Sequence, residues 1–195
     1  GGVSLELSKV IEPPAPELFH QKLPLNIDLT VEGLGMVYSS SCAGCHSSTF
    51  SEWKHSAHAT GIQSSTYLNK IKEYGNGTLC TQCHLPLAPQ HKELTTSYIE
   101  DDYSRPVNEA NPNWNLTLHL DSVGCASCHV REGVIVGTKT AEQPHPVRNS
   151  KTMQISKACE KCHQYTFPGE KEPAYNTVQE WQNSAYGNAG IECQT

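Results

Sequence analysis

One short cysteine motif recurs along the chain and constrains its fold more than any other feature. The motif is Cys-x-x-Cys followed at once by His, and it occurs at residues 42–46, 80–84, 125–129 and 159–163. These motifs use eight of the nine cysteines. On one short turn, two thiols can bond the two vinyl groups of a porphyrin while the adjacent imidazole ligates its iron. The pattern therefore predicts four covalently attached haem c groups.

Each motif assigns the same roles to its residues. The thioether-forming residues are Cys42, Cys45, Cys80, Cys83, Cys125, Cys128, Cys159 and Cys162. The proximal iron ligands are His46, His84, His129 and His163. A zinc ribbon and a disulfide framework are the alternatives for paired cysteines. Neither needs a His directly after the second Cys, whereas all four motifs have one, so haem is the better interpretation.

The composition supports a cofactor-filled interior. Apolar residues make up 36% of the chain, below the usual range for a globular protein. Yet the chain lacks the long single-sign charge runs and polar low-complexity tracts that are typical of disorder. Haems are large, flat and apolar, and they resolve this conflict. We expect a mainly irregular fold with short α-helices and little β structure, organised by a stack of haems.

The net charge indicates which partners to expect, and the start of the chain indicates the compartment. The net charge is −6, and the haem propionates would add to it, so nucleic acid is not an expected partner. No stretch approaches the roughly 20 apolar residues that span a bilayer. The chain opens at Gly1 without an initiator Met or a signal peptide, which is typical of a mature exported form. Because c-type haem is attached outside the cytoplasmic membrane, we expect an extracellular or periplasmic protein.

The cysteine-free start predicts a separate segment. Residues 3–10 alternate apolar and polar side chains, a strand pattern, and several prolines then keep the chain extended. We predict an extended Pro-rich arm at residues 1–35, followed by a multihaem cytochrome domain at residues 36–195. Two uses of the arm are open: it wraps its own haem stack, or it docks on another subunit.

Local patterns predict the remaining elements. Periodicity and end signals predict helices at residues 51–60, 67–74, 155–165 and 177–186. We expect a brief strand at residues 134–136 and a loop from Leu85 to Asp121.

The end of the chain repeats an earlier part. Glu52-Trp53-x-x-Ser-Ala-His58 aligns with Glu180-Trp181-x-x-Ser-Ala-Tyr186, and a Gly-Ile pair follows each. Cys193 comes 34 residues after Cys159, the interval that also separates Cys125 from Cys159. It opens the first three positions of a fifth motif. The simplest account is a longer polypeptide cut inside that motif; the alternative is a natural terminus with a thiol that is free or cross-linked to another chain.

Six further histidines are available as distal iron ligands: His20, His55, His58, His91, His119 and His145. This surplus predicts bis-His iron, which has a lower potential than Met/His iron. We select His58, on the helix of Trp53, and His145, between two prolines, together with His119 and His20. His55 and His91 are alternatives whose simpler roles are surface or propionate-bonding. Tyr186 occupies the His58 position of the repeat and is a weaker alternative.

Several of these segments resemble one family. They are the four motifs, the Trp53-x-x-Ser-Ala-His58 segment, Cys-His84-Leu-Pro, Gly124-Cys125-Ala-Ser-Cys-His129-Val and Pro144-His145-Pro. Together they resemble the tetrahaem cytochromes linked to hydroxylamine oxidation and their relatives among large multihaem cytochromes. The resemblance implies distal ligation by His58 and His145, and haems stacked in alternating parallel and perpendicular pairs. It also implies a link to extracellular cytochrome filaments, in which a His of one subunit ligates a haem of the next.

The predicted function is electron transfer along closely packed haems, without enzymatic activity of its own. The arm favours a polymerised extracellular filament, with other cytochromes or redox proteins and further copies of the chain as partners. Two alternatives are open. One is a multihaem reductase or oxidase of small nitrogen or sulfur compounds, which needs an iron with an open distal side. The other is a soluble periplasmic electron shuttle.

Overall fold

A computed structural model describes residues 24–74, 77–102, 105–142, 144–167 and 170–195. Its α-helices are short, and the longest has ten residues. They are α1 (Ser39–Cys42), α2 (Ser47–Lys54), α3 (Ala57–Thr60), α4 (Ser65–Tyr74), α5 (Thr78–His84), α6 (Leu116–Leu120), α7 (Cys125–His129), α8 (Glu160–His163), α9 (Thr177–Gln182) and α10 (Ala185–Asn188). The 3₁₀ turns are η2 (Gly61–Gln63), η3 (Ala88–Gln90), η4 (Ile99–Asp101), η5 (Thr152–Gln154) and η6 (Ser156–Cys159).

The strands form small separate sheets. They are β1 (Thr30–Val31), β2 (Gly35–Met36), β3 (Glu93–Tyr98), β4 (Pro106–Ala110), β5 (Val130–Arg131), β6 (Val134–Gly137), β7 (Val147–Asn149), β8 (Gln164–Tyr165) and β9 (Tyr175–Asn176). β1–β2, β3–β4 and β8–β9 are antiparallel pairs, and β6 joins antiparallel β5 to parallel β7. Sheets this small add little stability by themselves, so the elements depend on what packs between them.

The aliphatic core is small and lies around the third motif. Ile27, Val31, Val37, Leu87, Leu118, Ala126 and Val130 form its buried cluster. A second cluster, Ile62, Tyr67 and Leu85, lies beside the second motif. Buried Gln90 connects η3 to α6 and to the turn that follows it, because its side-chain amide donates to the carbonyls of Leu118 and Ser122. The second and third motifs are therefore fixed by ordinary packing as well as by any cofactor.

Part of the N-terminal segment takes part in this core. Leu25 pairs with Leu87 as an isolated β-bridge, and Ile27 and Val31 are buried. The described residues 24–35 thus wrap the chain's own domain. Residues 1–23, with His20 and the expected strand at residues 3–10, lie outside the described residues.

The predicted elements agree with the structure in type more often than in extent. Helix α4 confirms the helix expected at residues 67–74, and β6 confirms the strand expected at 134–136. The expected helix at 155–165 is split into η6 and α8, and Tyr165 belongs to β8. The short helices fit the expected fold class, while the haem stack stays a prediction.

Three local expectations are wrong in extent. The loop expected from Leu85 to Asp121 contains the β3–β4 hairpin and α6, whose first turn is capped because the Asn115 side chain accepts the Leu118 N–H. The helix expected at 51–60 starts at Ser47 and breaks at Ser56, whose backbone is extended. The helix expected at 177–186 breaks in the same way at Ser184, and Gly187 lies inside α10 rather than ending the helix.

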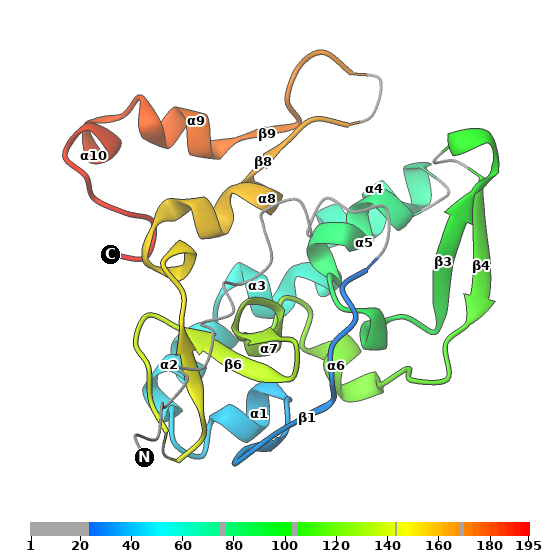
Figure 1. Cartoon of the computed structure of the whole chain (residues 1–195). Coiled ribbons are helices and arrows are strands. Elements are labelled where there is room, and N and C mark those ends of the chain that lie inside the picture. The colour runs from blue at the N-terminus through cyan, green and yellow to red at the C-terminus, as the bar shows by residue number, and fades with distance from the viewer. Residues whose placement is uncertain (1–23, 75–76, 103–104, 143, 168–169) are drawn as a thin grey trace, which may run out of the picture.

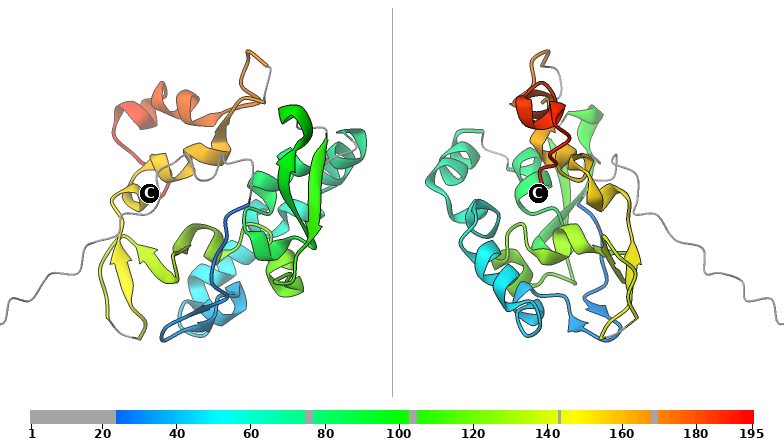
Figure 2. Two further views of the ribbon diagram at one scale, coloured as in Figure 1. Left: turned by 45° about the vertical axis from the view of Figure 1, so that its right-hand side comes forward. Right: turned by 90° about the vertical axis from the view of Figure 1, so that its left-hand side faces the viewer.

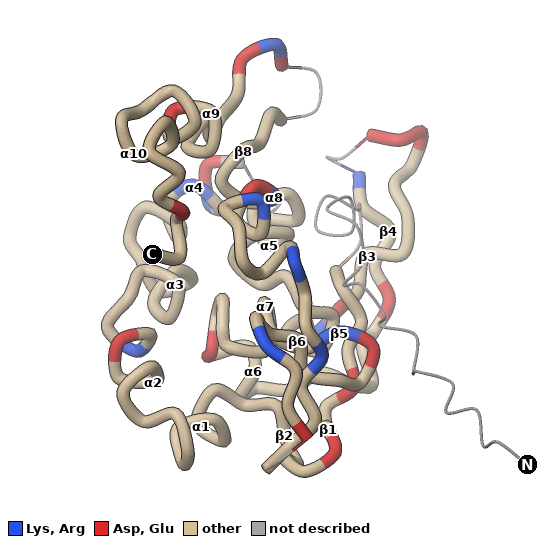
Figure 3. The backbone as a smooth tube through the Cα atoms, turned by 60° about the vertical axis from the view of Figure 1, so that its left-hand side comes forward, with Lys and Arg blue, Asp and Glu red and all other residues tan. Residues whose placement is uncertain are grey.

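The elements are arranged with the third motif near the centre. Figure 1 shows α7 and β6 between the β3–β4 hairpin on one side and α9–α10 on the other. Both views of Figure 2 place α9 and α10 at the periphery. Lys, Arg, Asp and Glu are spread over many separate elements (Figure 3). Across the described ranges, no helix has the length and apolar character needed to cross a membrane.

Candidate haem-binding sites

Each motif lies on a helical turn or starts at the end of one. The second and third motifs lie within α5 and α7, and the fourth within η6 and α8. The first begins at the end of α1, where the His46 N–H donates to the Cys42 carbonyl at 2.9 Å. Residues three apart on such a turn share a face. The backbone therefore puts both thiols of each motif on one side, as two thioethers to one porphyrin require.

The alternatives for the cysteines have no counterpart in the described residues. All nine cysteines are described, and each is free of a disulfide bond. Within the same described ranges, no three His, Cys, Asp or Glu side chains gather as a metal-binding group. A tetrahedral zinc site would need such a group.

Two proximal histidines each face a predicted distal histidine. The ring centroids of His46 and His145 are 6.4 Å apart, and those of His58 and His163 are 6.0 Å apart. An imidazole nitrogen lies about 2 Å from a metal that it ligates and about 1 Å from its own ring centre, so two rings on opposite sides of one metal have centroids about 6 Å apart. Both pairs thus have the spacing of two axial ligands.

The backbone around these distal residues is held in place. The Trp53 indole N–H donates to the Val123 carbonyl at 2.9 Å, and the Val123 N–H donates to the His58 carbonyl at 3.2 Å. The segment of His145 lies against the β1–β2 turn, where a Cβ on Gly33 would come within 2.7 Å of the Pro144 carbonyl oxygen. Gly33 has φ +75°, so only a glycine permits this close approach without strain.

Two further histidines are oriented as metal ligands usually are. A carbonyl can only accept, so the Nδ1–H of His129 donates to the Val136 carbonyl at 2.8 Å, and that of His119 donates to the Gln90 carbonyl at 2.9 Å. Such a bond fixes the tautomer and leaves Nε2 with a lone pair for a metal. The predicted roles of His129 and His119 are compatible with this geometry.

The remaining histidines have other neighbours. The His84 ring lies 4.6 Å from the Tyr67 ring, centroid to centroid, too close for a metal between them. His55 is exposed and bonds the Ser51 carbonyl of its own helix. His91 uses Nε2 to donate to the Leu85 carbonyl at 2.7 Å. His55 and His91 therefore have structural partners, which agrees with their lower rank as ligands.

Two of the histidines have a lowered pKa. Burial, and then the nearby His163, lowers the pKa of His58. Burial, and then the nearby His58, lowers the pKa of His84. A lowered pKa favours the neutral imidazole, whose free lone pair is the form that ligates iron.

Cysteines of different motifs lie side by side. A hydrogen bond from the Cys42 thiol raises the pKa of Cys42 and lowers that of Cys125 to about 6. A bond from the Cys162 thiol in the same way raises the pKa of Cys162 and lowers that of Cys83. Cys128 is close enough to Cys162 to raise its pKa further. The first and third motifs are thus neighbours, as are the second and fourth, and the third and fourth.

Ser39 and Asp121, which join the first and third motifs, were not predicted from the sequence. The Ser39 N–H donates to Asp121 Oδ2 at 2.8 Å, and Ser39 Oγ accepts the Cys125 N–H at 3.1 Å. Ser39 is 1% exposed. A signal was present in the sequence, because a serine also stands three residues before Cys125 and Cys159.

Buried polar atoms near the third motif suit the carboxylates of a haem. Ser127 Oγ, inside that motif, and Arg148 Nη1 are buried without a hydrogen-bond partner among the described residues. Arg148 pairs in register with Val136, whose carbonyl bonds His129. Buried polar groups almost always have partners. The residues around this motif therefore fit a haem, whose carboxylates could accept hydrogen bonds from Ser127 and Arg148.

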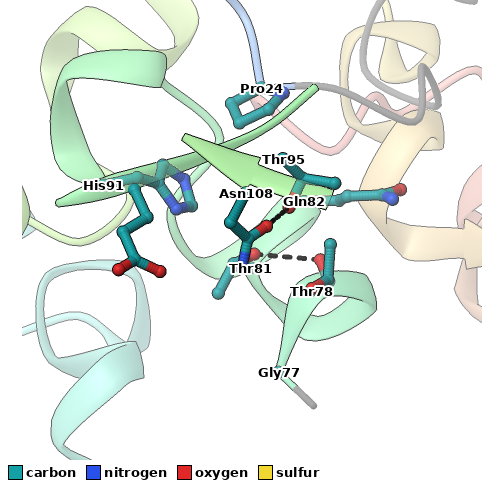
Figure 4. A pocket seen from close by; sticks show the side chains of 9 residues that line it. Pro24, Gly77, Thr78, Thr81, Gln82, His91, Thr95 and Asn108 are labelled. Atoms are coloured by element: carbon teal, nitrogen blue, oxygen red, sulfur yellow. Dashed lines mark hydrogen bonds between the residues drawn. The ribbon is translucent and has the colours of Figure 1, made fainter. Parts of the chain in front are cut away.

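A polar pocket of about 220 Å³ lies behind the second motif. Figure 4 shows Thr78, Thr81 and Gln82 of α5 facing Thr95 and Asn108 of the β3–β4 hairpin, with Pro24 and His91 at its edges. Its described lining includes no motif Cys or His. The pocket is thus formed by the side of α5 opposite its attachment residues.

The comparison with known families agrees with these sites. Residues 41–130 match the family model described as cytochrome c554 and c-prime. The match spans the first three motifs and His58, and ends before His145 and the fourth motif. No curated protein and no solved structure matches the chain. The family match and the repeated motifs together support a c-type cytochrome that carries covalently bound haem c and transfers electrons.

Proposed function

We propose that this protein transfers electrons along a row of four c-type haems. The observation that carries the proposal is the contact between cysteines of different motifs. Cys42 lies beside Cys125, Cys83 beside Cys162, and Cys128 near Cys162. Each cysteine is an attachment point, so these contacts order the attachment sites as first, third, fourth and second.

The chain's contribution is to hold the sites close and to control their surroundings. When bound, haem c supplies an iron that accepts and releases one electron. The protein sets its potential through the axial ligands, hydrogen bonds to them, and burial. The Val136 carbonyl, by accepting the His129 Nδ1–H, increases the basicity of that imidazole.

We further propose bis-His ligation with specific partners. His145 would hold the iron of the first motif together with His46, and His58 would hold the iron of the fourth together with His163, because the ring centroids of these pairs are 6.4 and 6.0 Å apart. His119 is a third distal ligand, with Nδ1 bonded to Gln90 and Nε2 directed elsewhere. His20 stays a predicted ligand from the arm.

The proposed setting is extracellular or periplasmic, and the protein itself is not an enzyme. Its partners are other cytochromes or redox proteins, and copies of the same chain joined through the arm into a filament. Residues 24–35 fasten the base of the arm to the domain through the Leu25–Leu87 bridge. Electron microscopy of native material tests this part: filaments support it, and monodisperse particles favour a soluble shuttle.

Electron paramagnetic resonance tests the function. The wild-type protein should give low-spin ferric signals, and His145→Ala should convert one iron to a high-spin signal. His55→Ala is the matched control and should leave the spectrum unchanged, because His55 bonds its own helix. A strong high-spin signal in the wild type, with turnover of nitrite or sulfite, would favour the reductase alternative. Alkylation of the motif cysteines as free thiols would refute haem attachment altogether.

A further inference from the structure

The C-terminal segment repeats the contacts that hold the third motif. We define the first unit as residues 39–60 with 121–125, and the C-terminal unit as residues 156–193. In the first, the Trp53 indole N–H donates to the Val123 carbonyl and the Val123 N–H to the His58 carbonyl. In the second, the Trp181 indole N–H donates to the Ile191 carbonyl at 2.8 Å and the Ile191 N–H to the Tyr186 carbonyl at 3.0 Å.

The same correspondence holds one step further along the chain. Two residues after Val123, the Cys125 N–H donates to Ser39 Oγ at 3.1 Å. Two residues after Ile191, the Cys193 N–H donates to Ser156 Oγ at 2.8 Å. Ser39 stands three residues before Cys42, and Ser156 three residues before Cys159. Both serines are buried, at 1% and 0% exposure.

A carboxylate completes each serine site. The Ser39 N–H donates to Asp121 Oδ2, and the Ser156 N–H donates to Glu192 Oε2. The two carboxylates come from different sequence positions relative to the cysteine that follows. Each serine N–H therefore donates to a carboxylate, which belongs to Asp121 in the first unit and to Glu192 in the C-terminal unit.

The cysteines themselves form equivalent pairs. Cys125 lies near enough to Cys42 to raise the pKa of Cys42, and Cys193 lies near enough to Cys159 to contribute to the raised pKa of Cys159. Cys193 thus stands to the fourth motif as Cys125, the first attachment cysteine of the third motif, stands to the first. This equivalence rests on the indole, serine, carboxylate and thiol contacts together, and not on Cys193 alone.

We propose that Cys193 is the first attachment cysteine of a further haem c, held beside the fourth motif as the third motif is held beside the first. The inference rests on the proposed function, since it needs the complete motifs to carry haem. In the attachment, the S–H bond adds across a vinyl C=C bond. The sulfur joins the carbon next to the ring and the hydrogen joins the outer carbon, so no oxidant or reductant is consumed.

The two units differ at the distal ligand. The His58 ring faces His163, whereas the corresponding Tyr186 is 65% exposed. The C-terminal unit therefore keeps the attachment scaffold of the first unit but presents a phenol where the first presents an imidazole. Helix α10 does not supply an imidazole to a neighbouring iron.

Peptide mapping of the haem-loaded protein tests the proposal. Non-covalent haem is extracted with acid, free thiols are alkylated, and the digest is read by mass spectrometry. We expect the Cys193 peptide to carry haem, and Cys193→Ser to lower the haem count by one per chain. An alkylated Cys193 beside haem-bearing complete motifs would overturn this inference alone. Alkylated cysteines in the complete motifs would overturn the proposed function.

A matched pair of serine variants separates the scaffold from the cysteine. Ser156→Ala should lower haem occupancy at Cys193 several-fold and leave the third motif fully occupied. Ser39→Ala should lower occupancy at Cys125 and leave Cys193 unaffected. If Ser156→Ala lowers occupancy at every motif equally, or at none, the equivalence of the two units is refuted. The readout is the mass of each peptide, so it does not depend on electron-transfer activity.

Discussion

The first unit and the C-terminal unit make the same contacts with chain segments of very different separation. In the first unit, the Val123 N–H donates to the His58 carbonyl, and the second motif and the β3–β4 hairpin lie between these two residues in the sequence. In the C-terminal unit, the Ile191 N–H donates to the carbonyl of Tyr186, only five residues earlier. The scaffold is therefore defined by its hydrogen bonds and not by sequence spacing. Residues 61–120 lie between the two parts of the first unit.

The two units also differ in their surroundings. The first lies against the core, where α1 contacts α7 and Trp53 is half-buried. The C-terminal unit lies at the periphery (Figure 2), and its Trp181 hydrogen bond is exposed. Water can replace a lost bond in the second unit more easily than in the first. Equivalent substitutions should therefore cost more in the first unit.

The largest contrast is expected at the ligand position. His58→Ala removes the ring that faces His163 and should convert the fourth-motif iron from low to high spin. Tyr186→Ala changes the equivalent position without removing an imidazole, and should leave the spin state of every iron unchanged. Electron paramagnetic resonance of both variants checks this. A low-spin spectrum in His58→Ala would remove His58 from the ligand set.

The next effect concerns Gly124, the residue directly before Cys125. A Cβ on Gly124 would come within 2.7 Å of Ser39 Oγ and 3.0 Å of Asp121 Cβ. Gly124→Ala should lower the free energy of unfolding by about 1–3 kcal/mol through overpacking. Gly44→Ala is the control, because its Cβ would meet only the Ser41 carbonyl oxygen, at 3.8 Å. Denaturant titration measures both, and equal costs would contradict the close packing at Gly124.

The indole pair should show a smaller difference. Trp53→Phe removes the donor to Val123 and leaves a half-buried carbonyl without its partner, at an expected cost of about 1–2 kcal/mol. Trp181→Phe removes the equivalent bond in an exposed setting and should cost about 0.5 kcal/mol. Thermal unfolding of the two variants gives the comparison. A larger loss in Trp181→Phe would reverse our ranking of the units.

The smallest effect is a pair of opposite pH dependences. Burial raises the pKa of Asp121, although bonds from Ser39 oppose the rise. In the folded state the Asp121 carboxyl therefore keeps its proton to a higher pH than in the unfolded state. The contribution of Asp121 to the free energy of unfolding falls as pH rises from 3.8 through the folded pKa. Bonds from Ser156 lower the pKa of Glu192. The stabilising contribution of the Glu192 carboxylate is present above pH 4.5 and is lost as pH falls through the folded pKa.

Two amide variants measure these slopes. Asp121→Asn should gain stability over the wild type as pH rises from 4 to 6, because the buried charge no longer forms. Glu192→Gln should lose stability over the same interval, because its charge-assisted bond to Ser156 is gone. Urea unfolding at several pH values gives the differences. Slopes of the same sign in both variants would show that the carboxylates are not in the contrasting environments described here.

Sequence spacing predicted local features well and long-range equivalence poorly. The alignment of Glu52–His58 with Glu180–Tyr186 is confirmed by the matching breaks at Ser56 and Ser184. The Gly-Ile pairs that extend this alignment are not equivalent, however. Ile62 is buried beside Tyr67, whereas Ile191 takes the place of Val123. The interval of 34 residues suggested a regular series of motifs, while the contacts relate Cys193 to Cys125.

The haem-binding chemistry could be predicted from the sequence because it depends on local spacing. Two thiols and an imidazole on one turn are sufficient for the attachment of one haem, so all the motif residues could be named without a fold. The pairing of His46 with His145 and of His163 with His58 could not be predicted in this way. It depends on Gly33, Val123 and Trp53, which bring distant segments together.

The four repeats of a haem-attachment motif and the low share of apolar residues, 36%, can be read from the sequence alone. Which motifs are neighbours and which histidines face each other is known only from the folded structure. The physical reason is that a thioether site is made within one helical turn, whereas the distance between two sites depends on hydrogen bonds such as Ser39 to Asp121, made between residues far apart in the chain.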